Sequence, residues 1–466
     1  MNDQFDYKTG FIAYPEDSSG DIGKKAPYVD HGTDIPDKSR YYSKEESELE
    51  WEKLWQKVWV FAGLTQDIEE VGDYFKYDLG RESFIIVRTA PEEIKAFYNV
   101  CPHRGNRLVY NEFGRAGKNE RNGKDCFTCC FHGWKFGIEG ELQEIRDYII
   151  FRDEVKAKAH GLIEVRCEIW NSLVFITMDD DAQPLLEYMD VIPEHLKVFP
   201  LDKLRVLRDL EIEWDANWKT ALEAFVEFYH ADNVHPEVIP FSDTLETQYD
   251  LYANGMSRMF IRNGYATCRV DNRDEVSEEM KGLVSLYGGN PDDYKHIKGY
   301  EWRKAFCDTK RKWAKRNGHD FFKNLTDDQV TDDWNYHIFP TITINVFSDG
   351  LLIQNFRPHA TDPEKCVYQA ITMCLPVTDP EQHVFDINSF GPEAFGPKGW
   401  DGTVRPNRFR PSKLEDYGHV LAQDSERVPE VQKGLRSKAF KGSLLSESEC
   451  RIRHYLAEVD KYLGRG

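Results

Sequence analysis

The sequence lacks the features that mark several broad classes of protein. No apolar run is long enough to cross a bilayer, and the first residues, Met1 to Asp6, lack the basic and apolar pattern of a secretory signal. The 60 Lys and Arg are outnumbered by 81 Asp and Glu, and the net charge of −21 would repel phosphate backbones and anionic lipid surfaces. We therefore expect a cytoplasmic globular protein that binds neither nucleic acid nor membrane.

The chain also has no internal repeat, no low-complexity segment and no G-x-G-x-x-G motif after a predicted strand. Without that motif it is not expected to bind a nicotinamide cofactor itself. At 466 residues it is long enough for two or three domains, each with its own core.

Ten cysteines are present, but their spacing does not form a disulfide framework. Six are scattered, as expected of buried thiols in a reducing compartment: Cys167, Cys268, Cys307, Cys366, Cys374 and Cys450. The other four fall between residues 101 and 130, and this clustering needs a separate explanation.

Two short motifs within that cluster each pair one cysteine with one histidine. Cys101-x-His103 is followed, after twenty-five residues, by Cys129-x-x-His132, and each motif lies at the end of a predicted strand. A structural zinc site normally joins C-x-x-C to H-x-x-x-H, whereas a Rieske [2Fe–2S] cluster takes two cysteines on one iron and two histidines on the other. We therefore predict a Rieske cluster. The alternative, a Cys126-x-x-Cys129 redox pair, lacks a flanking βαβ pattern, and Cys126 and Cys130 are interpreted as two more buried thiols.

A second group of metal-binding side chains lies in the stretch Glu227-x-x-His230-x-x-x-x-His235. Two histidines and one carboxylate can hold non-haem Fe(II) and leave positions open for dioxygen. Apolar periodicity predicts a helix from Asn217 to His230, which places Glu227 and His230 on one face. His235 precedes Pro236 and cannot lie below His230 in an unbroken helix. Alone, this pattern is also typical of an ordinary polar helix face.

Periodicity further predicts a small antiparallel β domain between a helix with an aromatic face, which begins at residue 44, and a second domain. The first forty residues are expected to form an irregular arm. The strands of the β domain are predicted at 74–77, 84–89, 94–100, 162–166 and 173–178. The second domain is predicted to contain a charged helical region at 272–334, a β meander at 341–347, 351–356 and 367–375, a helix at 413–438 and another near the C-terminus.

With both metal-binding groups in view, the chain resembles the large (α) subunit of the Rieske non-haem iron aromatic-ring-hydroxylating oxygenases, from roughly Tyr41 to Gln432. The similar segments are the two cluster motifs with Arg104-Gly105 and Gly133-Trp134, Trp170 to Phe175, Asn217-Trp218-Lys219 ahead of the Glu227 motif, and Gln423-Asp424 followed by Gln432 and Gly434-Leu435.

The resemblance implies an α+β fold in which a small antiparallel β Rieske domain (59–178) is inserted in a catalytic domain. The catalytic domain would comprise an N-terminal arm and helix (1–58) and residues 179–466, with an antiparallel sheet packed by helices in the helix-grip manner. The resemblance also implies two cofactors, a [2Fe–2S] cluster at Cys101, His103, Cys129 and His132 and a mononuclear Fe(II) at His230, His235 and Asp424.

In the same family a carboxylate links the two centres across a head-to-tail homotrimer, with or without a small β subunit. Here that carboxylate is Glu227, which would be hydrogen-bonded between His230 and the partner subunit's His132. Such a carboxylate would fix the tautomer of both imidazoles and couple the centres electrostatically. The resemblance thus gives Glu227 a catalytic role as an electron bridge, and Asp424 replaces it as the third iron ligand.

The activity implied is that of a terminal oxygenase, which uses O2 and electrons from a separate NAD(P)H-dependent reductase, with or without a ferredoxin, to hydroxylate an aromatic or related hydrophobic substrate. Many members carry Asp at the bridging position, and the gap between the cluster motifs is longer here than in ring dioxygenases. The substrate class therefore stays open. A monooxygenase or demethylase of O-methyl, N-methyl or quaternary amine compounds is one alternative, and a pure iron–sulfur electron-transfer protein is another.

The substrate pocket is expected beside the helix around Phe225 and the β meander. Candidate lining residues of the meander are Ile342, Ile344, Val346 and Phe356. Apolar strand residues of this kind more often belong to a plain core.

Overall fold

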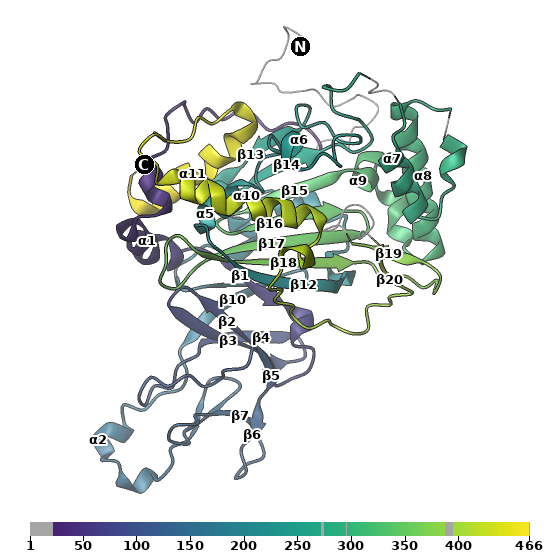
Figure 1. Cartoon of the computed structure of the whole chain (residues 1–466). Coiled ribbons are helices and arrows are strands. Elements are labelled where there is room, and N and C mark those ends of the chain that lie inside the picture. The colour runs from purple at the N-terminus through teal and green to yellow at the C-terminus, as the bar shows by residue number, and fades with distance from the viewer. Residues whose placement is uncertain (1–21, 272–274, 295, 387–394, 466) are drawn as a thin grey trace. The chain divides into compact units, whose positions relative to one another are not determined.

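The computed structural model describes residues 22–271, 275–294, 296–386 and 395–465. Half of the predicted N-terminal arm, residues 1–21, thus lies outside the described residues. The chain forms two compact units: Glu50–Tyr188 with His359–Thr361, and the rest of the chain (Figure 1). The predicted domain ranges remain predictions. No helix in the described part of the chain has the length and apolar character of a membrane span.

The smaller unit is built on two antiparallel sheets. The five predicted strands are present as β2 (Asp73–Leu79), β3 (Glu82–Ala90), β4 (Glu93–Tyr98), β10 (Glu164–Trp170) and β11 (Leu173–Thr177). Together with β1 (Val60–Leu64) and β5 (Phe113–Arg115) they form one sheet in the order β1-β11-β10-β4-β3-β2-β5. The second sheet contains β6 (Gly117–Lys118), β7 (Asp125–Thr128), β8 (Lys135–Gly137) and β9 (Leu142–Glu144).

The aromatic helix predicted from residue 44 ends earlier than its pattern suggests. It consists of α1 (Lys44–Glu50) and a π-helical turn at Trp51–Trp55. Val58 and Trp59 are buried but not helical, and the indole Nε1–H of Trp59 donates to the Gln183 carbonyl at 2.9 Å. Their burial comes from the entry into strand β1, so the predicted continuation of the helix is wrong.

The larger unit contains a seven-stranded antiparallel sheet with the order β12-β18-β17-β16-β15-β14-β13. The predicted meander is confirmed as β16 (Ile342–Phe347), β17 (Gly350–Pro358) and β18 (Cys366–Cys374). The strands of this sheet that the prediction missed are β12 (Arg205–Trp214), β13 (Gln248–Leu251), β14 (Ser257–Ile261) and β15 (Asp333–Ile338). A separate two-stranded sheet, β19 (His383–Phe385) and β20 (Phe395–Lys398), was not predicted either. Charged and amide side chains break the apolar pattern of β12 and β15, so neither stretch shows the alternation by which a strand is predicted.

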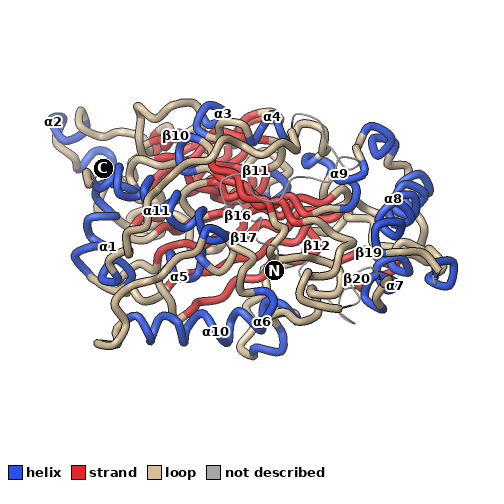
Figure 2. The backbone as a smooth tube through the Cα atoms, turned by 90° about the horizontal axis from the view of Figure 1, so that it is seen from above, coloured by secondary structure: helices blue, strands red, loops and turns tan. Residues whose placement is uncertain are grey.

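Helices cover this sheet. The charged region predicted as helical contains α7 (Glu278–Leu286), α8 (Gly299–Arg316) and α9 (Asp327–Thr331), but its last two residues begin β15 instead. The two C-terminal helices are confirmed as α10 (His419–Leu435) and α11 (Cys450–Leu463). A short helix, α5 (Trp218–Glu223), contacts β17 and β18, and α10 packs against α5 (Figures 1 and 2). The predicted α+β fold is thereby confirmed.

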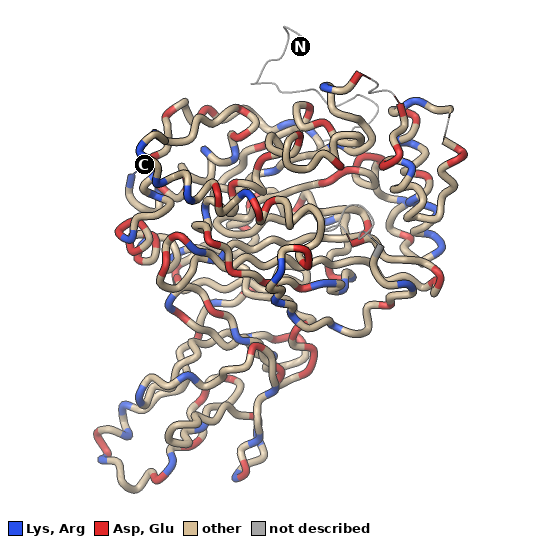
Figure 3. The backbone as a smooth tube through the Cα atoms, viewed as in Figure 1, with Lys and Arg blue, Asp and Glu red and all other residues tan. Residues whose placement is uncertain are grey.

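Charges of both signs follow one another along the backbone of each unit (Figure 3). Several of them meet inside the larger unit as buried ion pairs. Arg258 pairs with Asp250 at 2.7 Å, and Arg303 holds both carboxylate oxygens of Asp332. Buried charges of this kind are stable only when they are paired and hydrogen-bonded.

One buried amide, Gln432, joins α10 to the start of α5. Its Oε1 accepts the backbone N–H of Asn217 at 3.0 Å and the hydroxyl of Thr220 at 2.8 Å, and its Nε2 donates to the Tyr41 carbonyl at 3.1 Å. Asn217 in turn caps α5 by accepting the N–H of Lys219. Helix α5, which precedes the His230 and His235 segment, and α10, which carries Asp424, are thus held together by polar contacts as well as by packing.

We predict that Gln432→Leu lowers the free energy of unfolding by about 1–3 kcal/mol, because it leaves a buried N–H and a buried hydroxyl without an acceptor. Denaturant unfolding of the metal-loaded protein measures the change. Gln56→Leu, at an exposed position, is the matched control and should leave the midpoint unchanged. An unchanged midpoint for Gln432→Leu would show that this amide does not hold the helices together.

Candidate metal centres and substrate pocket

The two predicted cluster motifs lie in loops with the same backbone hydrogen bonds. The N–H groups of Cys101 and Cys129 each donate to the carbonyl five residues further on, at 2.7 and 2.8 Å. Their carbonyls each accept from a glycine four residues on, Gly105 and Gly133, at 2.9 Å. Both glycines have a φ of +75°, which residues with a side chain rarely adopt. The first loop follows β4 and the second joins β7 to β8, so the same tight turn presents a cysteine and a histidine twice.

The four side chains suit a Rieske cluster. Cys101 and Cys129 are each 1% exposed, whereas His103 and His132 are half-buried with ring centroids 4.5 Å apart. The indole of Trp134 stacks on His103 at 4.8 Å. Nδ1 of His103 is buried and has no hydrogen-bond partner among the described residues, which is the state expected of a nitrogen that binds a metal. Two buried thiols with two imidazoles on the open side match the two-cysteine and two-histidine ends of such a cluster.

The protonation states agree with this interpretation. Burial, followed by the neighbouring Cys129 thiol, raises the pKa of Cys101 to about 11. Burial, followed by the neighbouring His132, lowers the pKa of His103. A neutral imidazole is ready to bind a metal, whereas the thiols would release their protons when a metal binds.

The remaining cysteines give no redox pair. All ten are free thiols, so Cys126 and Cys129 form no disulfide. Cys126 is buried as expected, but Cys130 is exposed beside Tyr110, and the prediction of burial is wrong for it. Cys268 is exposed as well, against expectation, because it lies on the surface loop after β14.

The helix predicted from Asn217 to His230 is wrong beyond Glu223, where α5 ends. Beyond α5, Oε2 of Glu227 accepts the backbone N–H groups of Tyr229 and, at 3.1 Å, His230, and the Tyr249 hydroxyl accepts the N–H of Phe228 at 3.2 Å. In a continuous helix those N–H groups would bond to carbonyls four residues earlier, so these side chains keep the segment before His230 out of a helix. A new short helix, α6 (Ala231–Val234), begins directly after His230 and ends at His235.

This break brings His230, His235 and Asp424 to one point. Nε2 of His235 lies 3.2 Å from Nε2 of His230 and 3.1 Å from Oδ1 of Asp424, and the His230–Asp424 distance is 3.7 Å. The three ligand atoms all lie within 4.8 Å of one another. His235 and Asp424 are 5% and 3% exposed. Two imidazoles and one carboxylate converging in this way fit a single Fe(II) with open coordination positions.

Each imidazole is oriented by an acceptor behind it. The Nδ1–H of His230 donates to Oε1 of Glu227 at 2.5 Å, and the Nδ1–H of His235 donates to Oε1 of Gln423 at 2.6 Å. Both Nε2 lone pairs therefore face the ligand point, as is usual for metal-bound histidines. Burial opposes a charge on His230, but Glu227 and then Asp424 outweigh it and raise the pKa of His230 to about 9. The site thus attracts positive charge.

Gln423 belongs to a segment similar to the family, but the sequence assigns it no role. Its position directly before Asp424 is the available signal, because consecutive residues of a helix point in different directions and can contact one site from two sides. The structure gives it a second contact, from its Nε2–H to Oε2 of Glu237 at 3.3 Å. This contact fixes which end of the amide faces His235.

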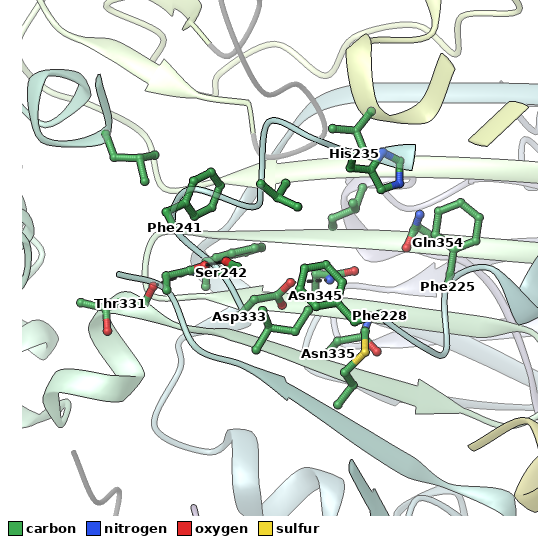
Figure 4. Close-up of a pocket in the computed structure, with 18 of the residues that line it drawn as sticks. Phe225, Phe228, His235, Phe241, Ser242, Thr331, Asp333, Asn335, Asn345 and Gln354 are labelled. Carbon is green, nitrogen blue, oxygen red and sulfur yellow. Dashed lines mark hydrogen bonds between the residues drawn. The ribbon is translucent and has the colours of Figure 1, made fainter. Parts of the chain in front are cut away.

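The three candidate ligands line a cavity of about 170 Å³ in the larger unit. Figure 4 shows this cavity with His235 among its lining residues. A cavity of this order can hold a molecule the size of benzene. Its walls are largely apolar and include Phe225, as predicted. Ile342, Ile344 and Val346 do not line it, so that prediction is wrong: they alternate with Asn345 and Phe347, which face the cavity, and lie buried on the other side of the sheet.

Phe356 was also predicted to line the cavity and does not. It packs behind Phe225, with ring centroids 5.2 Å apart, and so supports the wall from outside. The sheet itself contributes polar side chains to the cavity floor, which the sequence did not reveal: Asp333, Asn335, Asn345 and Gln354.

A Rieske-type loop pair in one unit and a two-histidine, one-carboxylate site in the other define a class of proteins with two iron centres. Comparison with protein-family models agrees. The Rieske [2Fe-2S] domain matches residues 58–148, and the ring hydroxylating alpha subunit (catalytic domain) matches residues 201–465, more than half of the chain. The chain therefore belongs to the ring-hydroxylating α-subunit family, as predicted. The two domains imply a Rieske [2Fe–2S] cluster and a mononuclear iron.

Curated relatives include oxygenases of different substrates. The chain is 30% identical to the carnitine monooxygenase oxygenase subunit of Escherichia coli over 47% of its length and 55% of the relative. It is 25% identical to the glycine betaine monooxygenase oxygenase subunit of Pseudomonas aeruginosa over 45% and 46%. It is 32% identical to the large oxygenase component of the 2,4-dinitrotoluene dioxygenase system of a Burkholderia species over 43% and 44%. The matched segments thus span about half the length of these relatives.

Solved structures share the fold across nearly the whole chain. A quaternary ammonium Rieske monooxygenase is similar at a TM-score of 0.63 and 18% identity, covering 94% of this chain and 99% of that one. Naphthalene 1,2-dioxygenase from a Rhodococcus species is similar at a TM-score of 0.58 and 16% identity, covering 92% and 94%. At these identities the likeness concerns the fold alone.

We predict that Asp424→Ala loses the mononuclear iron and keeps the visible absorption of the Rieske cluster, because it removes one of three ligands in the larger unit and none in the smaller. Metal analysis together with the absorption spectrum measures both. Glu426→Ala, an exposed acid on the same helix, is the control and should retain all iron. Full iron retention in Asp424→Ala would point instead to Glu415 or Asp416.

We predict that Gln423→Ala weakens the binding of the mononuclear iron by about 10- to 100-fold, because His235 loses the acceptor that orients its ring. Competition with a chelator measures the affinity. Gln423→Glu keeps an acceptor at this position and should restore most of the affinity. Equal affinities in the wild-type and Gln423→Ala proteins would exclude an orienting role.

Proposed function

We propose that the protein is a terminal oxygenase component, which takes electrons from a separate NAD(P)H-dependent reductase and uses O2 to oxidise a small organic substrate. The observation that supports this most strongly is the convergence of His230, His235 and Asp424 on the wall of a largely apolar cavity. A pure electron-transfer protein would need no second ligand set beside a cavity of substrate size.

In this proposal Cys101, Cys129 and the two loop histidines hold the cluster, and the His230, His235 and Asp424 side chains hold the iron. When bound, the cluster supplies single electrons and the mononuclear iron supplies the site at which O2 is activated. The protein then has to position the substrate and exclude water. Phe225, Phe228 and Phe241 suit that role, since their side chains line the cavity (Figure 4).

Glu227 is proposed as the bridge between centres in neighbouring subunits. Its carboxylate is 8% exposed, accepts from the imidazole of His230, and is held in place by two backbone N–H groups. A carboxylate fixed in this way can accept a further hydrogen bond from the partner subunit's His132 in a head-to-tail homotrimer. The proposal includes this trimer and a cytoplasmic location, where the free thiols would stay reduced.

The cavity floor bears on the substrate class. Two buried oxygens of this floor, Oδ1 of Asp333 and Oδ1 of Asn345, have no hydrogen-bond donor among the described residues, and a hydrocarbon would leave both unsatisfied, which is costly. An organic molecule with both an apolar part and a nitrogen-containing polar part would satisfy walls and floor together. This observation favours, as a second candidate beside hydroxylation of an aromatic compound, oxidation of a nitrogen-containing compound; two of the relatives are named as monooxygenases of carnitine and glycine betaine.

We predict that Glu227→Gln keeps both iron centres and lowers substrate oxidation by about 10- to 100-fold, because it weakens the bridge without removing a ligand. The assay follows product, NAD(P)H consumption and hydrogen peroxide release with a generic reductase. Glu430→Gln, an exposed position on α10, is the control and should retain full activity. Full turnover by Glu227→Gln would contradict the bridging role.

A further inference from the structure

One carboxylate in the cavity, that of Asp333, is only half satisfied. Asp333 begins strand β15 and is 9% exposed. Its Oδ2 accepts the amide N–H of Asn345 at 2.7 Å. Its Oδ1 is buried, and among the residues that the structure describes none donates a hydrogen bond to it. The residue lines the cavity, so a bound molecule is the partner that could reach this oxygen (Figure 4).

The cations nearest to this floor are engaged elsewhere. Arg303 pairs with Asp332, and Lys310 pairs with Asp349 at 2.7 Å. Arg451 donates to the side chains of Asn335 at 2.8 Å and Ser257 at 2.9 Å. None of the three forms an ion pair with Asp333 in the described structure, so the carboxylate lacks a positive partner in direct contact.

Without a cation in contact, the charged form of the buried Asp333 carboxylate is disfavoured. Burial, supported by the Asp332 carboxylate, raises the pKa of Asp333 to about 7, although Asn345 and Arg451 act in the opposite direction. An ionised carboxylate in a poorly solvated site is stabilised by a cationic hydrogen-bond donor more than by a neutral one.

The walls next to Asp333 are suited to a cation with an apolar body. Ile261 lies directly opposite Asp333 on the neighbouring strand β14. The aromatic rings that line the same cavity are Phe225, Phe228, Phe241, Tyr287, Phe306, Phe347 and Phe385. Aromatic faces attract alkylammonium groups and also pack against aromatic or aliphatic carbon.

We propose that Asp333 is a specificity-determining residue that binds the N–H group of a protonated amine on the substrate. The proposal rests on the oxygenase function above and refines it. The free Oδ1 accepts the ammonium N–H, Asn345 holds the other carboxylate oxygen in place, and the carbon skeleton extends toward the His230, His235 and Asp424 site. A quaternary ammonium group has no N–H, and a neutral isostere has no charge, so both should bind less well.

The test is calorimetric binding of three probes to the iron-loaded full chain without reductase or O2: benzylammonium, benzyltrimethylammonium and benzyl alcohol. The wild-type protein should bind benzylammonium at least about tenfold more tightly than the other two, the ratio expected for one charge-assisted hydrogen bond. Asp333→Asn should remove that preference by weakening benzylammonium about tenfold while benzyl alcohol changes by less than about twofold. Glu381→Gln, an exposed surface change, should alter none of the three affinities.

A second measurement uses only the wild-type protein and so does not depend on the folding of a variant. Because Asp333 is neutral below its raised pKa, the affinity for benzylammonium should fall as the pH decreases through about 7. Other titratable or charged groups face Asp333 or line the cavity, and benzyl alcohol reports their effect at each pH: Asp332, Arg451, Lys310, Glu227, His230, His235 and Asp424.

The outcomes separate this proposal from the oxygenase function. Equal affinity for amine and alcohol in the wild-type protein, absence of amine binding, or a preference that survives Asp333→Asn would overturn the role of Asp333 even if the protein oxidises substrates. Selective binding of benzylammonium without oxidation of any substrate would support Asp333 and contradict the oxygenase proposal instead.

Discussion

The larger unit depends on the hydrogen bonds of one carboxylate, that of Glu227. Oε2 accepts backbone N–H groups of Tyr229 and His230 and thereby holds the segment before His230 in a non-helical turn, while Oε1 accepts the imidazole N–H of His230. If α5 continued to His230, His235 would project from a different face. Because the helix breaks, the short turn α6 brings both Nε2 atoms to within 3.2 Å. The group proposed to carry electrons is therefore also the group that shapes the iron site.

The third candidate ligand and the acceptor behind His235 come from another part of the larger unit. Asp424 and Gln423 come from α10, far along the chain, and their position depends on the packing of α10 against α5 and on the buried amide of Gln432. The sheet beneath provides a floor whose polar side chains alternate with core residues. In the smaller unit, backbone hydrogen bonds again determine where the ligands lie. The same type of glycine turn occurs twice, and each turn presents one thiol and one imidazole.

Much of this could be predicted from the sequence where the signal is local. The spacing of Cys101-x-His103 and Cys129-x-x-His132, the meander and the C-terminal helices all follow from short-range patterns, and the structure agrees for the strands and helices. The family resemblance identified Asp424, which no spacing argument could reach, because its partners lie in a distant segment. The metal-binding roles themselves remain predictions until they are measured.

What could not be predicted depends on contacts that form only in the folded chain. The Glu227 carboxylate can accept the backbone N–H groups of Tyr229 and His230 because it is buried beside them. The intrinsic helix propensity of the segment does not reveal these hydrogen bonds. Strand β15 could not be predicted from apolar periodicity, because two of its buried residues, Asp333 and Asn335, are polar and face a cavity instead of solvent. The meander residues were placed on the wrong side for a related reason: alternation shows that a strand has two faces but does not show which one borders the pocket.

The two sites together lead to one proposal, that the chain carries a Rieske cluster and a separate mononuclear iron. The iron content of the purified protein before and after mild chelation, with the visible spectrum recorded alongside, tests this proposal. We expect about three iron atoms per chain, of which about one is removed by the chelator without loss of the cluster absorption. About two iron atoms, both lost only together with the cluster absorption, would contradict it.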